Sequence, residues 1–335
     1  MTALPFALDR QLNLTRVPAF LRAVQPKEHE LWRPPLTGAL VVGGGFVLAT
    51  LGYGLAGFIN RQLIAALTPE AAGAPIGDLI ADSKLSMVDC QDCLMGGITE
   101  TMVLGGVSIG FLVATLVFAW LVNRRSPLTW ITAAPTFRWR LFWAGLGLFS
   151  LLLAAMSAIP EAVHGWPDRP VILKAGESGS VRVLYFLVML AILPLAAASE
   201  EVFCRGWLMQ TTAAFTPNIL AILVFNSLLF SLIHVDNDLG RNLARMVFGM
   251  VLSYGALRLG GLEFGIGIHA ANNLVILLLA GTLPQTAHIA PSTTGSVVAN
   301  LALSVVALAL IEATARWGLL RRWTGLDDQA EDDDE

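Results

Sequence analysis

Eight apolar, largely uncharged segments recur along the chain, and they constrain its fold more than any other feature of the sequence. They occupy residues 36–60, 101–122, 141–159, 183–199, 217–234, 245–258, 262–281 and 297–315. Most are long enough to cross the ~30 Å hydrocarbon core of a bilayer as a helix. Lipid offers backbone groups no hydrogen-bond partners, and the alternating pattern of a β-barrel is absent. We therefore expect an all-α fold, a polytopic transmembrane helical bundle of about eight spans.

The composition excludes a soluble protein. Charged residues make up 14% of the 335 residues and hydrophobic residues 55%, whereas about 25% of an average soluble domain is charged. The net charge of −4 comes from the C-terminal end, because residues 327–335 contain seven carboxylates. No basic patch of nucleic-acid-binding size is present. We expect a lipid bilayer, and no nucleic acid, as a partner.

The apolar segments and their flanks predict five regions. These are a cytoplasmic N-terminal segment (1–35), N-terminal transmembrane helices with a long loop (36–182), a core that carries the polar motifs described below (183–281), a last transmembrane helix with a basic flank (282–322) and an acidic disordered tail (323–335). The long loop contains Cys90 and Cys93, a lone CxxC pair without a neighbouring histidine. We favour a local structural role for this pair, with redox chemistry or metal binding as alternatives.

The distribution of lysine and arginine predicts the orientation. If the N-terminus is inside, the cytoplasmic segments contain twice as many of these cations as the outer segments. Much of the difference comes from Arg124, Arg125, Arg138 and Arg140. By the positive-inside rule we expect both termini in the cytoplasm. Few lysines and abundant Ala, Gly and Leu favour a bacterial source, and hence the bacterial inner membrane.

Ionisable side chains inside apolar segments are costly and mark candidate functional sites. Glu200 and Glu201 follow the apolar run 183–198, yet the chain stays compatible with a helix up to Pro217. This predicts one helix of about 33 residues with both glutamates well inside it. Glu201 and Arg205 are i,i+4 neighbours and can pair on one face. Glu200 is rotated by about 100° and faces something else.

Two further motifs follow in the next apolar segments. Phe230 and His234 lie at the far end of segment 217–234. Counted back along a helical hairpin, His234 and Glu200 lie about 26 Å and 21 Å from the turn, so the two side chains can meet. His269 and Asn273 are i,i+4 neighbours on one helix face, with alanines between them. The alternative for this last pair is a helix–helix hydrogen bond.

A base, two imidazoles and an amide in a bilayer indicate hydrolysis. Glu200 could take a proton from water while a histidine holds that water in line. His269 and Asn273 could donate to the developing oxyanion. We favour a site without a cofactor. Zinc held by Glu200, His234 and His269 is the alternative, although the spacing HExxH is absent.

The three motifs, in this order, resemble those of the CPBP family, which contains type II CAAX prenyl endopeptidases and bacterial relatives linked to bacteriocin processing and self-immunity. The family's EExxxR, FxxxH and HxxxN (or HxxxB) read here as Glu200-Glu201 with Arg205, Phe230 with His234, and His269 with Asn273. The resemblance covers roughly residues 183–280.

The resemblance implies a glutamate-dependent intramembrane endopeptidase with an eight-helix fold. Glu200 would be the base, His234 would help to position the water, and His269 with Asn273 would form the oxyanion site. Glu201, Arg205 and Phe230 would be supporting residues. The expected partner is a membrane-associated peptide or protein substrate. The alternatives are a zinc-dependent version of this protease, a non-proteolytic membrane partner or immunity protein, and a transporter.

Overall fold

The computed structural model describes residues 18–67, 94–164, 171–173, 178–279 and 292–327. The helices in this part of the chain are α1 (Arg33–Leu67), α4 (Leu94–Asn123), α5 (Trp139–His164), α6 (Gly179–Glu201), α7 (Met209–Ala213), α8 (Ile219–Leu232), α9 (Leu239–Leu259), α10 (Glu263–Leu279), α11 (Thr294–Arg316) and α12 (Gly318–Thr324). Short 3₁₀ turns are η1 (Ala19–Leu21), η2 (Pro26–His29), η4 (Pro127–Trp130) and η5 (Val171–Leu173), and η6 (Val202–Leu208) is a π-helix. The described residues contain no strand beyond one isolated bridge, so the predicted all-α class is confirmed.

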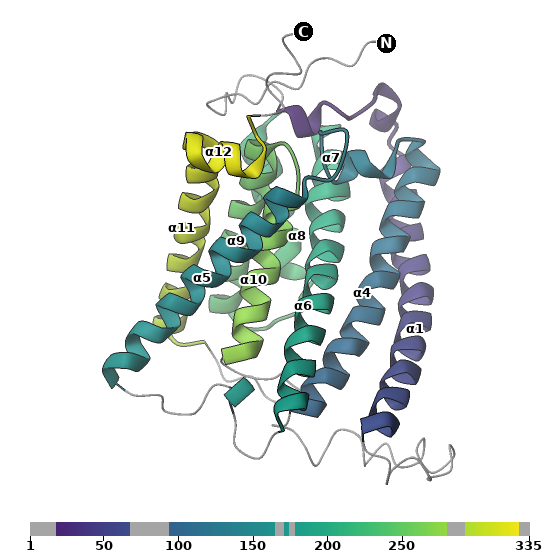
Figure 1. Ribbon diagram of the computed structural model, residues 1–335. Helices are drawn as coiled ribbons and strands as arrows, with labels where there is room; N and C mark the ends of the chain where they lie inside the picture. The colour runs from purple at the N-terminus through teal and green to yellow at the C-terminus, as the bar shows by residue number, and fades with distance from the viewer. Residues whose placement is uncertain (1–17, 68–93, 165–170, 174–177, 280–291, 328–335) are drawn as a thin grey trace.

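Most of the helices run along one common direction, and α5 crosses the bundle obliquely (Figure 1). α1 packs on α4, α4 on α6, and α6 on α10. α10 also packs on α5, while α9 packs between α8 and α11. The short elements η1 and α12 lie at the same end of the bundle (Figure 1). The largest cluster of buried apolar side chains draws on α5, α8, α9, α10 and α11.

Each of the eight apolar segments coincides with a helix. Among the residues that the structure describes, five helices are long and apolar enough to cross a membrane: Arg33–Asn60, Leu94–Asn123, Trp139–Ser157, Gly179–Ala213 and Thr294–Arg316. α8 and α10 are shorter apolar helices. The polytopic membrane bundle is therefore confirmed, whereas the count of eight spans stays a prediction. Cys90, Cys93 and residues 328–335 of the acidic tail lie outside the described residues.

The helix that carries the glutamates is continuous over 35 residues, from Gly179 to Ala213, as its sequence predicts. Ser178 caps its start by accepting a hydrogen bond from the N–H of Val181. The feature of this helix that the sequence did not predict is the π-helix η6. There the N–H of Met209 donates a hydrogen bond to the carbonyl of Cys204, five residues earlier. A π-turn adds one residue to the helical turn and is often found at functional sites.

α9 begins at Leu239, six residues before the apolar segment 245–258 that it contains. Arginines in the first two turns made this part look too polar for a helix among apolar segments. In the structure Arg241 and Arg245 pair with Asp236, while Asp238 accepts from the N–H of Arg241 and caps the helix.

A left-handed glycine ends α9 and sets the turn into α10. Gly260 has φ 72°, which glycine adopts without steric cost. Buried Arg138 then binds the carboxylate of Glu263 at 2.7 Å and donates to the carbonyl of Leu259 at 2.7 Å. The end of α9 and the start of α10 are thereby held against the beginning of α5.

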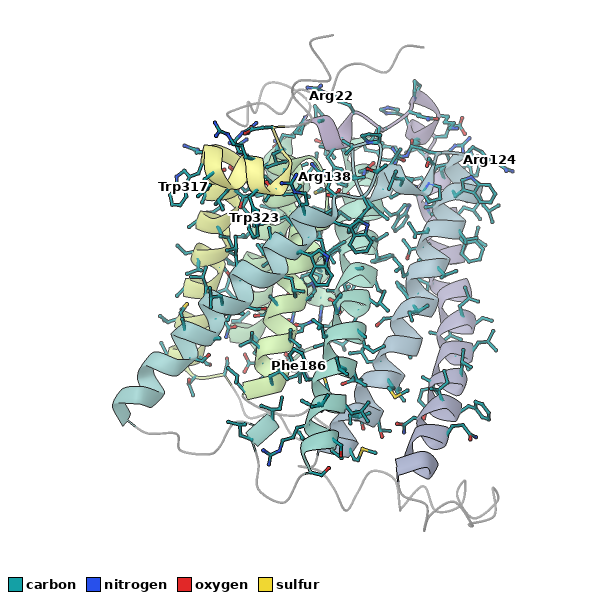
Figure 2. All side chains as sticks on the ribbon, in the orientation of Figure 1. Arg22, Arg124, Arg138, Phe186, Trp317 and Trp323 are labelled. Atoms are coloured by element: carbon teal, nitrogen blue, oxygen red, sulfur yellow. The ribbon has the colours of Figure 1, made fainter. Side chains whose placement is uncertain are left out.

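The side chains on the outer surface of the helices are apolar, as expected for a surface in contact with lipid. On α1, Phe46 is 74% exposed, and Leu51 and Phe58 are exposed as well. Arg22, Arg124, Trp317 and Trp323 lie spread across the end of the bundle that carries α12 (Figure 2). Tryptophan and arginine are the residues expected at a membrane–water interface, whereas the flanks of α1 fit the hydrocarbon core.

Candidate active site

Three helices bring the predicted site residues together. Glu200 and Glu201 end α6, where the apolar run gives way to the π-helix that contains Arg205. Phe230 lies in the last turn of α8 and His234 just beyond it, while His269 lies in the second turn of α10.

Glu200 lies between the two histidines. Its Oε2 is 3.7 Å from Nε2 of His234 and 3.8 Å from Nε2 of His269. The side chain is 36% exposed, but Oε2 itself is buried and has no hydrogen-bond partner. The meeting of Glu200 and His234, expected from the helix lengths, is therefore observed.

The Nδ1 atom of His234 is bound by a backbone carbonyl in the last turn of α8. Its Nδ1 lies 2.8 Å from the carbonyl oxygen of Phe230, and the two rings pack edge to face with centroids 4.9 Å apart. A carbonyl can only accept, so Nδ1 carries the proton and donates. In the neutral ring, Nε2 is then an acceptor, and it faces Glu200.

His269 is oriented by Glu201, a contact that the sequence analysis missed. Nδ1 of the buried imidazole lies 2.8 Å from Oε1 of Glu201 and donates a hydrogen bond to it. Nε2 is thereby directed towards Glu200. No local sequence signal could have shown this contact, because the two residues are 68 positions apart.

Glu201 and Arg205 form the predicted i,i+4 ion pair. Nη1 of Arg205 lies 3.0 Å from Oε1 of Glu201, and both side chains are fully buried. The guanidinium also lies over the ring of Phe230, 3.9 Å from its centroid, which adds a cation–π contact. Phe230 thus supports the site twice, through its ring to Arg205 and through its carbonyl to His234.

Asn273 has its hydrogen-bond partner on its own helix. It lies one turn beyond His269 on α10 and is half-buried. Its Oδ1 accepts a hydrogen bond from Nδ2 of Asn272 at 3.3 Å. Its oxyanion role stays a prediction.

The zinc alternative also stays a prediction. The ligand atoms of Glu200, His234 and His269 have the right chemistry for zinc, which binds nitrogen and oxygen at about 2.0–2.2 Å. Within the described ranges, however, no group of three or more His, Cys, Asp or Glu side chains could hold a metal ion.

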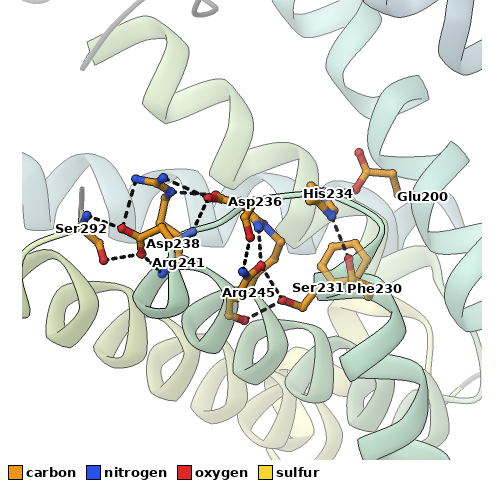
Figure 3. A network of polar contacts seen from close by, with 10 residues as sticks. Glu200, Phe230, Ser231, His234, Asp236, Asp238, Arg241, Arg245 and Ser292 are labelled. Carbon is orange, nitrogen blue, oxygen red and sulfur yellow. Dashed lines mark hydrogen bonds and ion pairs between the residues drawn. The ribbon is translucent and has the colours of Figure 1, made fainter. Parts of the chain in front are cut away.

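A charged cluster lies in the turn after His234, and the sequence analysis missed it (Figure 3). Asp236 binds Arg241 at 2.7 Å and Arg245 at 3.3 Å, and Asp238 accepts from the hydroxyl and the N–H of Ser292. The sequence signal that could have indicated this cluster is the presence of two acidic residues and two arginines within ten positions.

Two comparisons with known proteins gave a match. Residues 182–275 match the family model described as type II CAAX prenyl endopeptidase Rce1-like. Over 271 residues the chain is 26% identical to the uncharacterized protein YyaK of Bacillus subtilis (strain 168), and the alignment covers 78% of this chain and 81% of that relative. No solved structure matches the chain.

Proposed function

Residues 182–275 form a type II CAAX prenyl endopeptidase Rce1-like domain, and on this premise we propose that the protein is an intramembrane endopeptidase that uses a glutamate-activated water. Its substrate is a membrane-associated peptide or protein. The observation that carries the proposal is the position of the Glu200 carboxylate, whose Oε2 lies within 4 Å of Nε2 of both His234 and His269.

Glu200 acts as the general base. A water within hydrogen-bond reach of Oε2 gives one proton to the carboxylate as its oxygen attacks the scissile carbonyl carbon. Glu200 returns that proton to the leaving amine when the C–N bond of the tetrahedral intermediate breaks. His234 holds that water from the other side, because its Nε2 is free to accept while Nδ1 is tied to the carbonyl of Phe230. A positioned base contributes roughly 10²–10⁴ in rate.

His269 and Asn273 stabilise the oxyanion. Nδ1 of His269 already donates to Glu201, so donation from Nε2 requires the imidazolium form. The carboxylates of Glu200 and Glu201 beside the ring together balance the charges of this imidazolium and of Arg205. Asn273, one turn further along α10, supplies a second donor from its amide. Loss of one such donor costs about 10²–10³ in rate.

The first test compares newly formed protein termini in membranes that contain wild type or Glu200→Gln at equal levels. Terminal-peptide mass spectrometry should find cut sites with wild type that are absent with Glu200→Gln. Glu100→Gln on α4, distant in sequence from the three motifs, is the matched control and should leave the cut sites unchanged.

Identical termini with wild type and Glu200→Gln, in cells where both proteins are folded and inserted, would contradict proteolysis. The non-proteolytic partner or immunity protein would then be the better explanation. In that case Glu200→Gln should keep the phenotype of the gene.

A second test separates the glutamate and zinc mechanisms. Purified protein treated with a strong chelator should still cut the substrate identified by its Glu200-dependent cut sites, because a water activated by Glu200 needs no metal. Loss of cleavage with the chelator, restored by added zinc, would establish the zinc-dependent version.

A further inference from the structure

His234 lies where the helix that carries it has already ended. α8 stops at Leu232, and the N–H of His234 makes only a long bond of 3.4 Å to the carbonyl of Ser231. No further helical turn follows to hold the backbone on the C-terminal side. The direction of the imidazole therefore depends on the turn that joins α8 to α9.

That turn contains a strained residue directly after His234. Val235 has φ 47°, in the left-handed region that β-branched side chains rarely adopt. Its side chain is 87% exposed and packs against little that could hold it. A residue in such a conformation persists only where its surroundings enforce it.

The contacts that enforce the backbone conformation of Val235 come from Asp236 (Figure 3). Its carboxylate accepts from Nε and Nη2 of Arg241 at 2.7 and 3.0 Å, and from Nη2 of Arg245 at 3.3 Å. It also accepts from the N–H of Asp238 at 2.9 Å. The carbonyl of Asp236 accepts from Nδ2 of Asn242 at 2.6 Å. Side chain and backbone of this one residue are thus both tied to the start of α9.

A second tie, a hydrogen bond between α8 and α9, holds the turn on the N-terminal side of His234. The hydroxyl of Ser231 donates to the carbonyl of Asn242 at 2.8 Å, which joins the last turn of α8 to the first turn of α9. His234 and Val235 lie between this tie and the Asp236 contacts. The conformation of the two residues is therefore determined from both ends.

We propose that Asp236, through Arg241 and Arg245, is a positioning residue that holds the His234 imidazole towards Glu200. Asp236 touches neither Glu200 nor the reacting atoms, and it acts only by fixing the strained turn. The inference rests on the proposed function for what His234 does with the water, but the position of the ring can be tested without a substrate.

The first measurement is nitrogen NMR of the full-length protein in lipid nanodiscs with ¹⁵N-labelled histidine. The chain has five histidines, and His234→Gln assigns the signal of His234. Asp236→Asn keeps the size of the side chain and removes its charge. We expect it to shift the His234 signals towards the average of the two tautomers, because the bond to Phe230 is no longer enforced.

Asp327→Asn is the matched control. It removes the ion pair with Arg321 beside α12, away from the site, and should leave the His234 signals unchanged. Unchanged His234 signals in folded Asp236→Asn would overturn the proposal. If Asp236→Asn does not fold, Arg245→Gln removes the longer contact to Asp236 together with the bond from Arg245 to Oδ1 of Asn242. It should shift the same signals by less, and unchanged signals there would also overturn the proposal.

The second measurement uses the substrate found by its Glu200-dependent cut sites. Asp236→Asn should lower kcat by roughly 10²-fold with little change in KM, because a misplaced catalytic group of this kind costs about that factor. A drop in thermal stability without any change in kcat would show a purely structural role. If no Glu200-dependent cut exists, the proposed function fails, whereas the NMR result still decides whether Asp236 positions His234.

Discussion

Two adjacent glutamates have opposite surroundings, and this difference separates their roles. Glu200 is partly exposed, and its Oε2 has no hydrogen-bond partner, whereas Glu201 is buried and binds Arg205 and His269. The cause is the rotation of about 100° between neighbours on a helix. A carboxylate that must accept a proton needs a free oxygen, and one that orients an imidazole must be fully engaged.

Glu201→Gln should destabilise the protein by about 3–5 kcal/mol, because it leaves the buried Arg205 without a counter-charge. Its effect on cleavage should be smaller than that of Glu200→Gln and should arise through His269 and Arg205. The double variant Glu201→Gln/Arg205→Met should recover part of the lost stability. Thermal unfolding of the three proteins in nanodiscs measures this, and equal losses in the single and double variants would contradict it.

At the scale of elements, the length of α8 determines the level of the site. The continuous helix Gly179–Ala213 is about 52 Å long, and α8 is about 21 Å long. After the hairpin at 214–218, α8 therefore ends level with the middle of its partner, where Glu200 lies. A polar turn consequently forms at mid-height of the bundle instead of at its end, and ion pairs within the turn and α9 satisfy its charges.

The packing of α9 against the site depends on Gly249. A Cβ at this position would lie 2.7 Å from Nη2 of Arg205 and 3.0 Å from Cδ1 of Phe230. Overpacking of this kind typically costs about 1–3 kcal/mol. Gly249→Ala should therefore lower the unfolding temperature and reduce cleavage, even though alanine is the better helix former.

Gly265→Ala on α10 is the control for that substitution, because a Cβ at Gly265 meets nothing within 4 Å. It should be neutral or stabilising by up to about 1 kcal/mol, the difference in helix propensity. Equal unfolding temperatures for the two variants would contradict the close approach of α9 to Arg205.

At the scale of the whole molecule, charge and apolar surface are separated along the bundle. The end that carries α12 contains Arg22, Arg124, Trp317 and Trp323 (Figure 2), whereas the flank of α1 exposes apolar side chains. Arg140 near the start of α5 donates to the carbonyl of Arg322 on α12 at 2.9 Å, so the basic segments meet there. This favours the α12 end as the cytoplasmic side.

The orientation can be read from reporter fusions. Green fluorescent protein fused to the C-terminus should be fluorescent, because that end is expected in the cytoplasm. Alkaline phosphatase inserted between α5 and α6, on the opposite side, should be active. The reverse pattern, with a silent C-terminal fluorescent protein and an inactive insertion, would contradict the predicted orientation.

The sequence by itself determined the helical membrane class, the positions of the apolar helices and the identity of the candidate site residues. Hydropathy and helical periodicity are local properties, so Glu200, the Glu201–Arg205 pair and the level of His234 could be derived from spacing alone. Even the length of the helix Gly179–Ala213 followed from the helix-compatible sequence that continues after Glu201 up to Pro217, although Pro194 lies within the helix.

Only the tertiary structure decided how these residues act on one another. The Glu201–His269 bond joins residues 68 positions apart, and the early start of α9 depends on ion pairs to Asp236 that no propensity reports. The π-helix at Val202–Leu208 likewise has no signature in the sequence. In a bilayer a buried charge is stable only beside its partner, and the packing of whole helices determines which partner that is.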